Sequence, residues 1–257
     1  IVKPLDGAGA SGTHKCTNDA ELRAACESLR VDQGRTVAIE EFLDGHEGFY
    51  DTLSVCGKPV IDFASHYYPN VLEAMRTRWI SPQIVCTNRI DGGHYEELRA
   101  MGQKVITALG IWTSPTHMEW FSGSKGLRFS EIGCRPPGVG VWDLYCAANE
   151  FDLYAAWAHA VVHEKVPFRP SRKYSAGMIA LRPDKDGVIS HYDGIEAMQR
   201  HCRDALIDMH LPPPGTATQG VEGGYMANAY VRLRHPDFDA LRALLNWVGE
   251  NVKVRAK

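Results

Sequence analysis

The stretch of sequence that decides the fold is THMEWFSGSKGLRFSEIG, residues 116–133. Residues 113–121 and 127–132 are rich in apolar, aromatic and β-branched side chains and predict two strands around a turn at residues 122–126. With the hairpin centred near Lys125, Glu119 and Glu131 face each other on one side of the ladder. Like charges that face each other destabilise a sheet, and partial burial of that side raises the cost.

A bound cation would remove this conflict. Two carboxylates, together with the phosphate oxygens of ATP, suit Mg²⁺. The alternative is an exposed hairpin in a slightly different register, with two solvated acids. We predict a metal site at Glu119 and Glu131.

A second motif, VKPLDGAGASGT, covers residues 2–13. A short strand ends in Lys3, and a loop follows that is rich in small residues. Glycines let backbone N–H groups approach phosphate oxygens closely, and the lysine adds a positive charge. The loop is not a Walker loop, because no Gly-Lys-Ser/Thr closes it, and a mobile surface loop is the alternative. Its candidate phosphate-binding residues are Lys3, Gly7, Gly9, Ser11 and Gly12, and we expect the loop to move without nucleotide.

A third motif, VAIEEFLDGHE, covers residues 37–47. A strand predicted over residues 36–43 ends in Glu40 and Glu41, followed by Phe42 and Leu43. A purine needs an apolar wall, and a carboxylate suits its exocyclic amine or a ribose diol. The alternative is a strand end with solvated acids.

A fourth motif is RPPGVG, residues 135–140, directly after the second strand of the hairpin. Arg135 near a metal would stabilise charge that develops on a transferring phosphoryl group. The alternative is a surface arginine before a helix.

Composition excludes several classes of protein. The chain has 257 residues, 44% of them hydrophobic, and a net charge of -3, so it carries no electrostatic footprint of nucleic-acid binding. No apolar run is long enough to cross a membrane. Seven scattered cysteines without a CxxC pair indicate reduced thiols and a cytoplasmic location. The chain opens on Ile1-Val2-Lys3 as a strand already in progress, so we expect further sequence before it in the natural protein.

Mixed strands and helices with hairpins predict an α+β fold with largely antiparallel sheets. Asn18 and Glu21 form a capping-box pattern that starts a helix ending near residue 30. Further helices are predicted over residues 94–109, 151–163 and 237–248, and further strands over 52–56, 59–67, 175–181 and 226–233.

The four motifs, in this order, resemble the ATP-grasp superfamily over residues 1 to about 163. The resemblance implies ATP and Mg²⁺ as cofactors, with Mn²⁺ as an alternative metal. Residue by residue, it implies phosphate binding by Lys3, an adenine hinge at Glu40, Glu41, Phe42 and Leu43, ribose binding by Glu47, metal binding by Glu119 and Glu131, and a phosphate or acyl-phosphate contact by Arg135.

Two departures from the ATP-grasp pattern are visible. Many members carry Asn two residues after the second metal glutamate, where this chain has Gly133. Members also have an N-terminal domain, and more of the nucleotide-binding domain, before the lysine strand. The resemblance therefore implies three parts here: residues 1–50 from the nucleotide-binding lid, 51–168 with the metal site, and 169–257 as a small cap domain.

The run EIGCRPPG, residues 131–138, is most similar to the biotin-carboxylase-like branch, which includes amino-acid ligases that make dipeptides. The implied function is an ATP-dependent ligase that joins a small-molecule carboxylate to an amine through an acyl phosphate. Relatives place substrate contacts in the stretch that holds His66, Tyr67, Arg76, Arg78 and Arg89. A carboxylase or formyl-transfer enzyme, and a nucleotide-binding module without turnover, are the alternatives. No nucleic-acid or membrane partner is expected, and a homodimer is left open.

Overall fold

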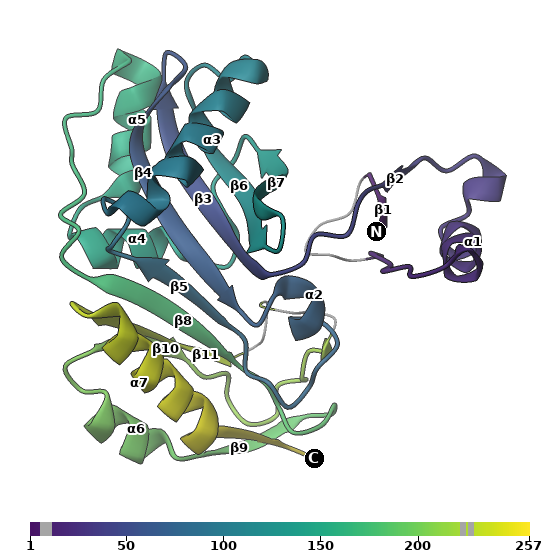
Figure 1. Cartoon of the computed structure of the whole chain (residues 1–257). Coiled ribbons are helices and arrows are strands. Elements are labelled where there is room, and N and C mark those ends of the chain that lie inside the picture. Colours follow the sequence, from purple (N-terminus) through teal and green to yellow (C-terminus); the bar gives the residue numbers. More distant parts are fainter. Residues whose placement is uncertain (6–11, 222–224, 226–228) are drawn as a thin grey trace.

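The computed structural model describes residues 1–5, 12–221, 225 and 229–257. An eight-stranded antiparallel sheet forms its centre, in the order β10-β11-β8-β5-β4-β3-β6-β7 (Figure 1). The strands are β3 (His46–Val55), β4 (Lys58–Tyr68), β5 (Gln83–Thr87), β6 (Ser114–Gly123), β7 (Gly126–Gly133), β8 (Ser175–Leu181), β10 (Leu206–His210) and β11 (Ala229–His235).

Helices cover both faces of this sheet, so its central strands are apolar on both sides. In β3, Phe49 faces a core that α4 (Val141–Asn149) and α5 (Leu153–His163) complete. Its neighbour Tyr50 faces the other core, against α3 (Glu96–Ala108). The helix α7 (Phe238–Asn251) packs over β8 and β11 through Leu241 and Leu245. Because successive side chains of a strand point to opposite faces, this burial fixes the register of β3.

Smaller elements complete the chain. The short helices η2 (Gly93–Tyr95) and α2 (Val71–Ala74) lie in connections of the large sheet. A two-stranded sheet pairs β9 (Ile189–Asp193) with β12 (Lys253–Ala256), beside α6 (Ile195–His201).

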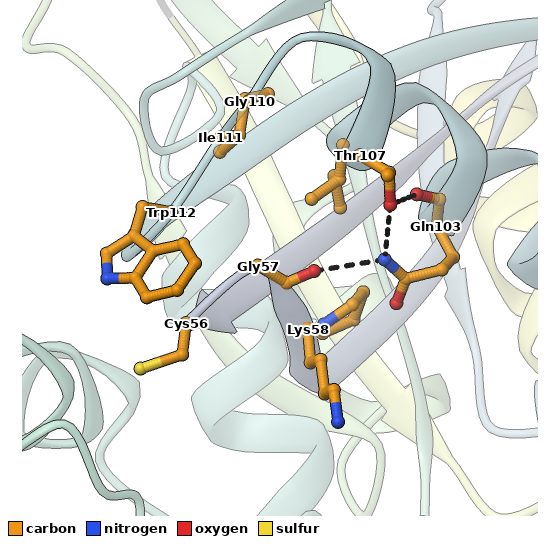
Figure 2. A pocket seen from close by; sticks show the side chains of 10 residues that line it. Cys56, Gly57, Lys58, Gln103, Thr107, Gly110, Ile111 and Trp112 are labelled. Atoms are coloured by element: carbon orange, nitrogen blue, oxygen red, sulfur yellow. Dashed lines mark hydrogen bonds between the residues drawn. The ribbon is translucent and has the colours of Figure 1, made fainter.

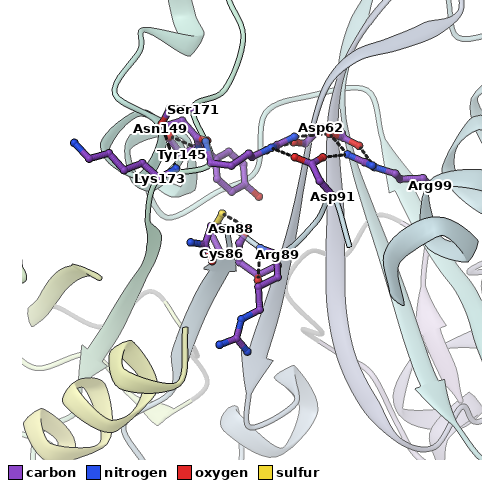
Figure 3. A network of polar contacts seen from close by, with 12 residues as sticks. Asp62, Cys86, Asn88, Arg89, Asp91, Arg99, Tyr145, Asn149, Ser171 and Lys173 are labelled. Carbon is purple, nitrogen blue, oxygen red and sulfur yellow. Dashed lines mark hydrogen bonds and ion pairs between the residues drawn. The ribbon is translucent and has the colours of Figure 1, made fainter. Parts of the chain in front are cut away.

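Asp62 of β4 anchors two connections to the large sheet (Figure 3). Its carboxylate accepts hydrogen bonds from Nε of Arg99 on α3 at 2.7 Å and from Nη2 of Arg172 at 2.6 Å. Tyr50 Oη also donates to it, at 3.1 Å. Bidentate or multiple contacts of this kind are stronger than single surface ion pairs, so α3 and the segment before β8 are held to the sheet by one carboxylate.

The N-terminal unit lies beside the start of β3 (Figure 1). The strands β1 (Val2–Pro4) and β2 (Val37–Ile39) pair antiparallel, and the helix α1 (Asp19–Ser28) and the turn η1 (Val31–Gln33) connect them. Asn18 caps α1 by accepting the N–H of Glu21 at 2.9 Å, which confirms the predicted start. The Glu21 carboxylate reaches back to the N–H of Thr17, one residue earlier than a capping box requires.

The predicted α+β fold with antiparallel sheets is confirmed, with some different bounds. The predicted strand over 36–43 is wrong beyond Ile39, because residues 40–45 leave the ladder and run as a connection into β3. Several elements were not predicted: α2, β5, α4, β9, α6, β10 and β12. Of the predicted domain boundaries, the one after residue 50 falls within β3, and the large sheet runs across the one at 168; the division itself stays a prediction.

Among the described residues, no helix combines the length and the apolar character that crossing a membrane requires.

The contact between α3 and the sheet makes a first prediction. A Cβ at Gly102 would lie 2.5 Å from Cε1 of Tyr50, a buried ring. We expect Gly102→Ala to lower the free energy of unfolding by about 1–3 kcal/mol through overpacking, although alanine favours a helix. Urea denaturation measures this. Gly93→Ala is the control, since nothing lies within 4 Å of its Cβ position, and equal stability of both variants would contradict the prediction.

Candidate active site

The hairpin β6–β7 brings Glu119 and Glu131 opposite each other, as predicted. Its two-residue turn pairs Gly123 with Gly126, and this register alone would place Ser130 opposite Glu119. A bulge between the Glu119 and Trp120 pairs shifts the ladder by one residue and turns Glu131 toward Glu119. The Glu119 side chain is 21% exposed and that of Glu131 58%, so the acid pair opens to solvent on the side of Glu131.

Lys3 joins the N-terminal unit to this acid pair. Its Nζ lies 3.2 Å from Oε2 of Glu131 and 3.0 Å from Oε2 of Glu40. Burial opposes the positive charge, but hydrogen bonds to Glu40 and Glu131 outweigh it and raise the pKa of Lys3. The structure thus brings together three residues that are distant in the sequence: Lys3, predicted to bind phosphate, Glu40 of the predicted hinge, and Glu131, predicted to bind metal.

The connection over residues 40–45, which contains the predicted hinge 40–43, contacts the turn of the β6–β7 hairpin. Lys125 in that turn pairs with Glu41, and Ser124 Oγ donates to Oδ1 of Asp44 at 3.0 Å. Gly45, at φ +100°, passes so close to the hairpin that a Cβ would collide with the carbonyl oxygen of Ser122. These contacts fix the position of residues 40–45 relative to the hairpin that carries Glu119 and Glu131.

The apolar pair of the hinge follows the two acids. Phe42 is 42% exposed, and Nζ of Lys15 lies 3.8 Å from its ring centroid. Leu43 is half-buried. An exposed aromatic ring beside the acids suits the predicted apolar wall for a purine.

Glu47, predicted to bind ribose, is only 5% exposed. Its Oε2 accepts the N–H of Val71, the first residue of α2, at 2.6 Å. Burial first, and then the negative charge of Glu119, raise the pKa of Glu47 to about 8 against the pull of the Val71 hydrogen bond. Glu131 adds to this repulsion, so three carboxylates create a negative potential that a cation would relieve.

Of the remaining predicted residues, the structure describes Arg135 and Gly12. Arg135 is exposed, follows the end of β7, and donates from Nη1 to the carbonyl of Pro136 at 2.9 Å. Gly12, at φ +70°, forms a turn against Pro4. Gly7, Gly9 and Ser11, and with them the predicted mobility of the loop, lie outside the described residues.

Sequence reasoning missed Asp51 and Tyr145. Asp51 is 1% exposed and contacts Nδ1 of His117 at 2.7 Å through Oδ1, while Tyr145 donates to Oδ2. Burial lowers the pKa of His117, but the charge of Asp51 and its hydrogen bond, with Glu119, outweigh this and raise it to about 9. The available signal was a period of two, since Glu47, Phe49 and Asp51 share the face of His117 and Glu119.

Two of the candidate substrate residues, His66 and Tyr67, lie on opposite faces of β4. Tyr67 faces the acids, and its hydroxyl donates to Oε1 of Glu119 at 3.4 Å. His66 points to the other face, where Nε2 lies 2.9 Å from Oη of Tyr95. Arg78 pairs with Asp186, and Arg89 with Asp237 and Asp239. Of this stretch, the structure brings Tyr67 to the site.

A pocket at the turn between β3 and β4 is a separate feature (Figure 2). It is lined by residues such as Gly57, Gln103 and Trp112, and Nε2 of Gln103 donates to the Gly57 carbonyl. It holds none of the predicted site residues. Cys56 follows the end of β3, whereas Glu47 lies at its start and Glu119 pairs with Phe49, so about 20–30 Å of strand separates this pocket from the acids.

The residues fit Mg²⁺ held partly by a nucleotide. Over the described ranges, no group of three or more His, Cys, Asp or Glu side chains is arranged to hold a metal alone. Mg²⁺ is usually bound by one or two carboxylates together with phosphate oxygens. Glu119 and Glu131 supply such a pair, with Lys3 beside them for phosphate.

Comparisons by sequence find weak similarity to one kind of enzyme. No family model matches the chain. It is 30% identical over 125 residues to a formate-dependent phosphoribosylglycinamide formyltransferase of Chlorobium phaeobacteroides, a match covering 46% of this chain and 30% of that protein. The corresponding enzyme of Bacteroides thetaiotaomicron is 28% identical over 171 residues, covering 64% and 41%. The matches thus span less than half the length of these relatives.

Solved structures share the fold over almost the whole chain. L-amino acid ligase from Bacillus licheniformis superposes with a TM-score of 0.78 at 16% identity, over 100% of this chain and 63% of that one. The biotin carboxylase domain of Hydrogenobacter thermophilus 2-oxoglutarate carboxylase, solved with MgADP and bicarbonate, gives 0.63 at 14%, over 98% and 56%. The chain therefore has the ATP-grasp fold, as its motifs predicted.

The raised pKa of Glu47 makes a prediction about pH. Its carboxyl holds a proton more tightly in the folded than in the unfolded state. Its contribution to the free energy of unfolding is therefore fully present below pH 4.5 and is lost as the pH rises through about 8. In metal-free buffer, the Tm of the wild type minus that of Glu47→Gln should fall steadily across this range. Thermal unfolding followed by circular dichroism measures it, and a difference that does not change with pH would contradict the prediction.

Proposed function

We propose that this chain carries the catalytic centre of an ATP-dependent ligase that joins a carboxylate to an amine. One observation carries the proposal: on an ATP-grasp fold, Lys3 contacts Glu131, which faces Glu119 across β6 and β7. The facing acids suit a cation, Lys3 suits phosphate and the exposed ring of Phe42 suits a purine, and their combination supports a nucleotide site. L-amino acid ligase, which gives the TM-score of 0.78, supports an amino acid as the carboxylate.

The chain's own residues supply positioning and charge. When bound, Mg-ATP supplies the phosphoryl group that turns the substrate carboxylate into an acyl phosphate, which an amine can attack. Glu119 and Glu131 would hold the metal, and Lys3 would hold phosphate oxygens. The hinge, residues 40–43, would hold adenine, Glu47 the ribose, and Arg135 would stabilise negative charge on the phosphoryl group or the oxyanion.

A carboxylase or formyl-transfer reaction of the same fold is the second candidate. The observation that favours it is the similarity to formate-dependent formyltransferases. The activated acid would then be formate or bicarbonate in place of an amino acid. A nucleotide-binding module without turnover is a candidate of another class, and Gly133 at a family metal position supports it.

The same proposal covers the location, partners, domain division, metal and oligomeric state of the whole protein. We infer a cytoplasmic protein without a nucleic-acid partner, with residues 1–50, 51–168 and 169–257 acting as lid, metal-binding and cap parts. Mn²⁺ would replace Mg²⁺ at an all-oxygen site. A homodimer is supported only by the dimer reported for the biotin carboxylase domain.

ADP release by the complete natural protein tests the proposed ligase. With Mg-ATP, release should require pooled amino acids and should fall at least a hundredfold in Glu131→Gln, which loses a metal-binding charge. Glu250→Gln, at an exposed glutamate of α7, should match the wild type. Release that requires bicarbonate or formate would favour the second candidate, and nucleotide binding without release under any condition would overturn the enzyme.

The role of Lys3 can be tested by binding alone. Removing a charged hydrogen bond costs about 1.5–3 kcal/mol, so Lys3→Met should weaken Mg-ATP about tenfold or more and leave adenosine binding unchanged. Isothermal titration calorimetry measures both affinities. Lys58→Met, at an exposed lysine on the distant β3–β4 turn, is the control. An equal loss for adenosine and Mg-ATP would show that Lys3 does not contact the phosphates.

A further inference from the structure

The buried carboxylate of Asp51 has no place in the proposed chemistry. It lies on β3, 1% exposed, and both of its oxygens are engaged. Oδ1 contacts Nδ1 of His117 at 2.7 Å, and Oδ2 accepts the hydroxyl of Tyr145. That hydroxyl also lies 3.1 Å from Oγ of Ser65, so Asp51 is locked in one orientation. A buried acid costs free energy unless its partners are well placed, which suggests that its orientation serves the site.

Asp51 in turn fixes the ring of His117 on the neighbouring strand. The ring is also held edge-on by Phe49, with 4.9 Å between the ring centroids. With Nδ1 held, Nε2 points toward Glu119 and lies 3.7 Å from Oε1. His117 pairs across the ladder with Gly133, which has no side chain to displace the ring.

The contacts on Glu119 fall on one of its oxygens. Oε1 lies near Nε2 of His117 and accepts the hydroxyl of Tyr67 at 3.4 Å. Within the described part of the chain, the contacts with Tyr67 and His117 both fall on Oε1, and Glu131 stands opposite across the ladder. A carboxylate that is held through one oxygen presents the other to a cation.

From this chain of contacts we propose that His117, oriented by Asp51, is a positioning residue that fixes Glu119 for metal binding. The inference rests on the proposed function, because it assumes a divalent cation between Glu119 and Glu131. Outer carboxylates and imidazoles that orient metal ligands change metal affinity about 10–100-fold when removed. Tyr67 assists from β4 through its hydrogen bond to Oε1 of Glu119.

The test measures metal binding directly and needs no turnover. The free Mn²⁺ signal in electron paramagnetic resonance, titrated with the complete natural protein and ADP, gives the Mn²⁺ affinity. His117→Phe keeps a ring but loses both nitrogens, and we expect it to weaken Mn²⁺ about tenfold or more while adenosine binding without metal stays unchanged. His117→Gln retains a donor near Nε2 and should recover part of the affinity.

Two further variants control for damage to the strand and for misfolding. Thr116→Val removes a buried 2.7 Å hydrogen bond to Thr52 on the opposite face of β6, and should bind Mn²⁺ like the wild type. Asp51→Asn keeps the shape but not the charge of the buried acid, and should weaken Mn²⁺. If His117→Phe does not fold, Asp51→Asn and His117→Gln decide the question.

The inference is overturned if His117→Phe binds Mn²⁺ as well as Thr116→Val does, or if it loses adenosine binding to the same degree. A Mn²⁺ affinity of His117→Gln that is no higher than that of His117→Phe also counts against it. Glu131→Gln separates the two proposals. If Glu131→Gln weakens Mn²⁺ but His117→Phe does not, this inference alone fails; if Glu131→Gln has no effect, the metal site and the proposed function fail together.

Discussion

The repulsion between Glu119 and Glu131 is the constraint on which the site depends. A single bulge within β7 brings these two acids face to face, where an unbroken ladder would separate them. Such a pair is unfavourable in an empty sheet, and the chain offsets it with Lys3, whose ammonium contacts Glu131. The same lysine joins the N-terminal unit to the large sheet, so one interaction both compensates the charge of Glu131 and holds that unit in place.

Negative charge spreads from this pair along one face of the sheet. Glu47 and Asp51 lie on β3 beside β6, and both are nearly inaccessible. They meet their burial in different ways. Glu47 retains its proton more tightly and accepts a backbone N–H at the start of α2, whereas Asp51 pairs with His117 and Tyr145. A cation would relieve the repulsion around Glu47, whereas the hydrogen bonds of Asp51 make its surroundings rigid.

The predicted hinge lies in a connection that pairs with no described strand but contacts the β6–β7 hairpin. Residues 40–45 make no strand, yet Gly45 passes against the β6–β7 turn where a side chain could not fit. Glu41 and Asp44 then bond to Lys125 and Ser124 of that turn. The same hairpin that carries Glu119 and Glu131 therefore sets the path of the segment expected to hold adenine.

The sequence by itself determined the fold class and the hairpin, because strand alternation and a glycine-bounded turn are local signals. The opposition of Glu119 and Glu131 was predicted too, but it depends on the bulge in β7, since the two-residue turn alone would place Ser130 opposite Glu119. It also determined the cap of α1. Only the tertiary structure decided that Lys3 meets Glu131, that Asp51 orients His117, and that His66 turns away from the site to which Tyr67 contributes. Those relations depend on which strands become neighbours and which face a helix covers, and no stretch of sequence encodes the pairing of β3 with both β4 and β6.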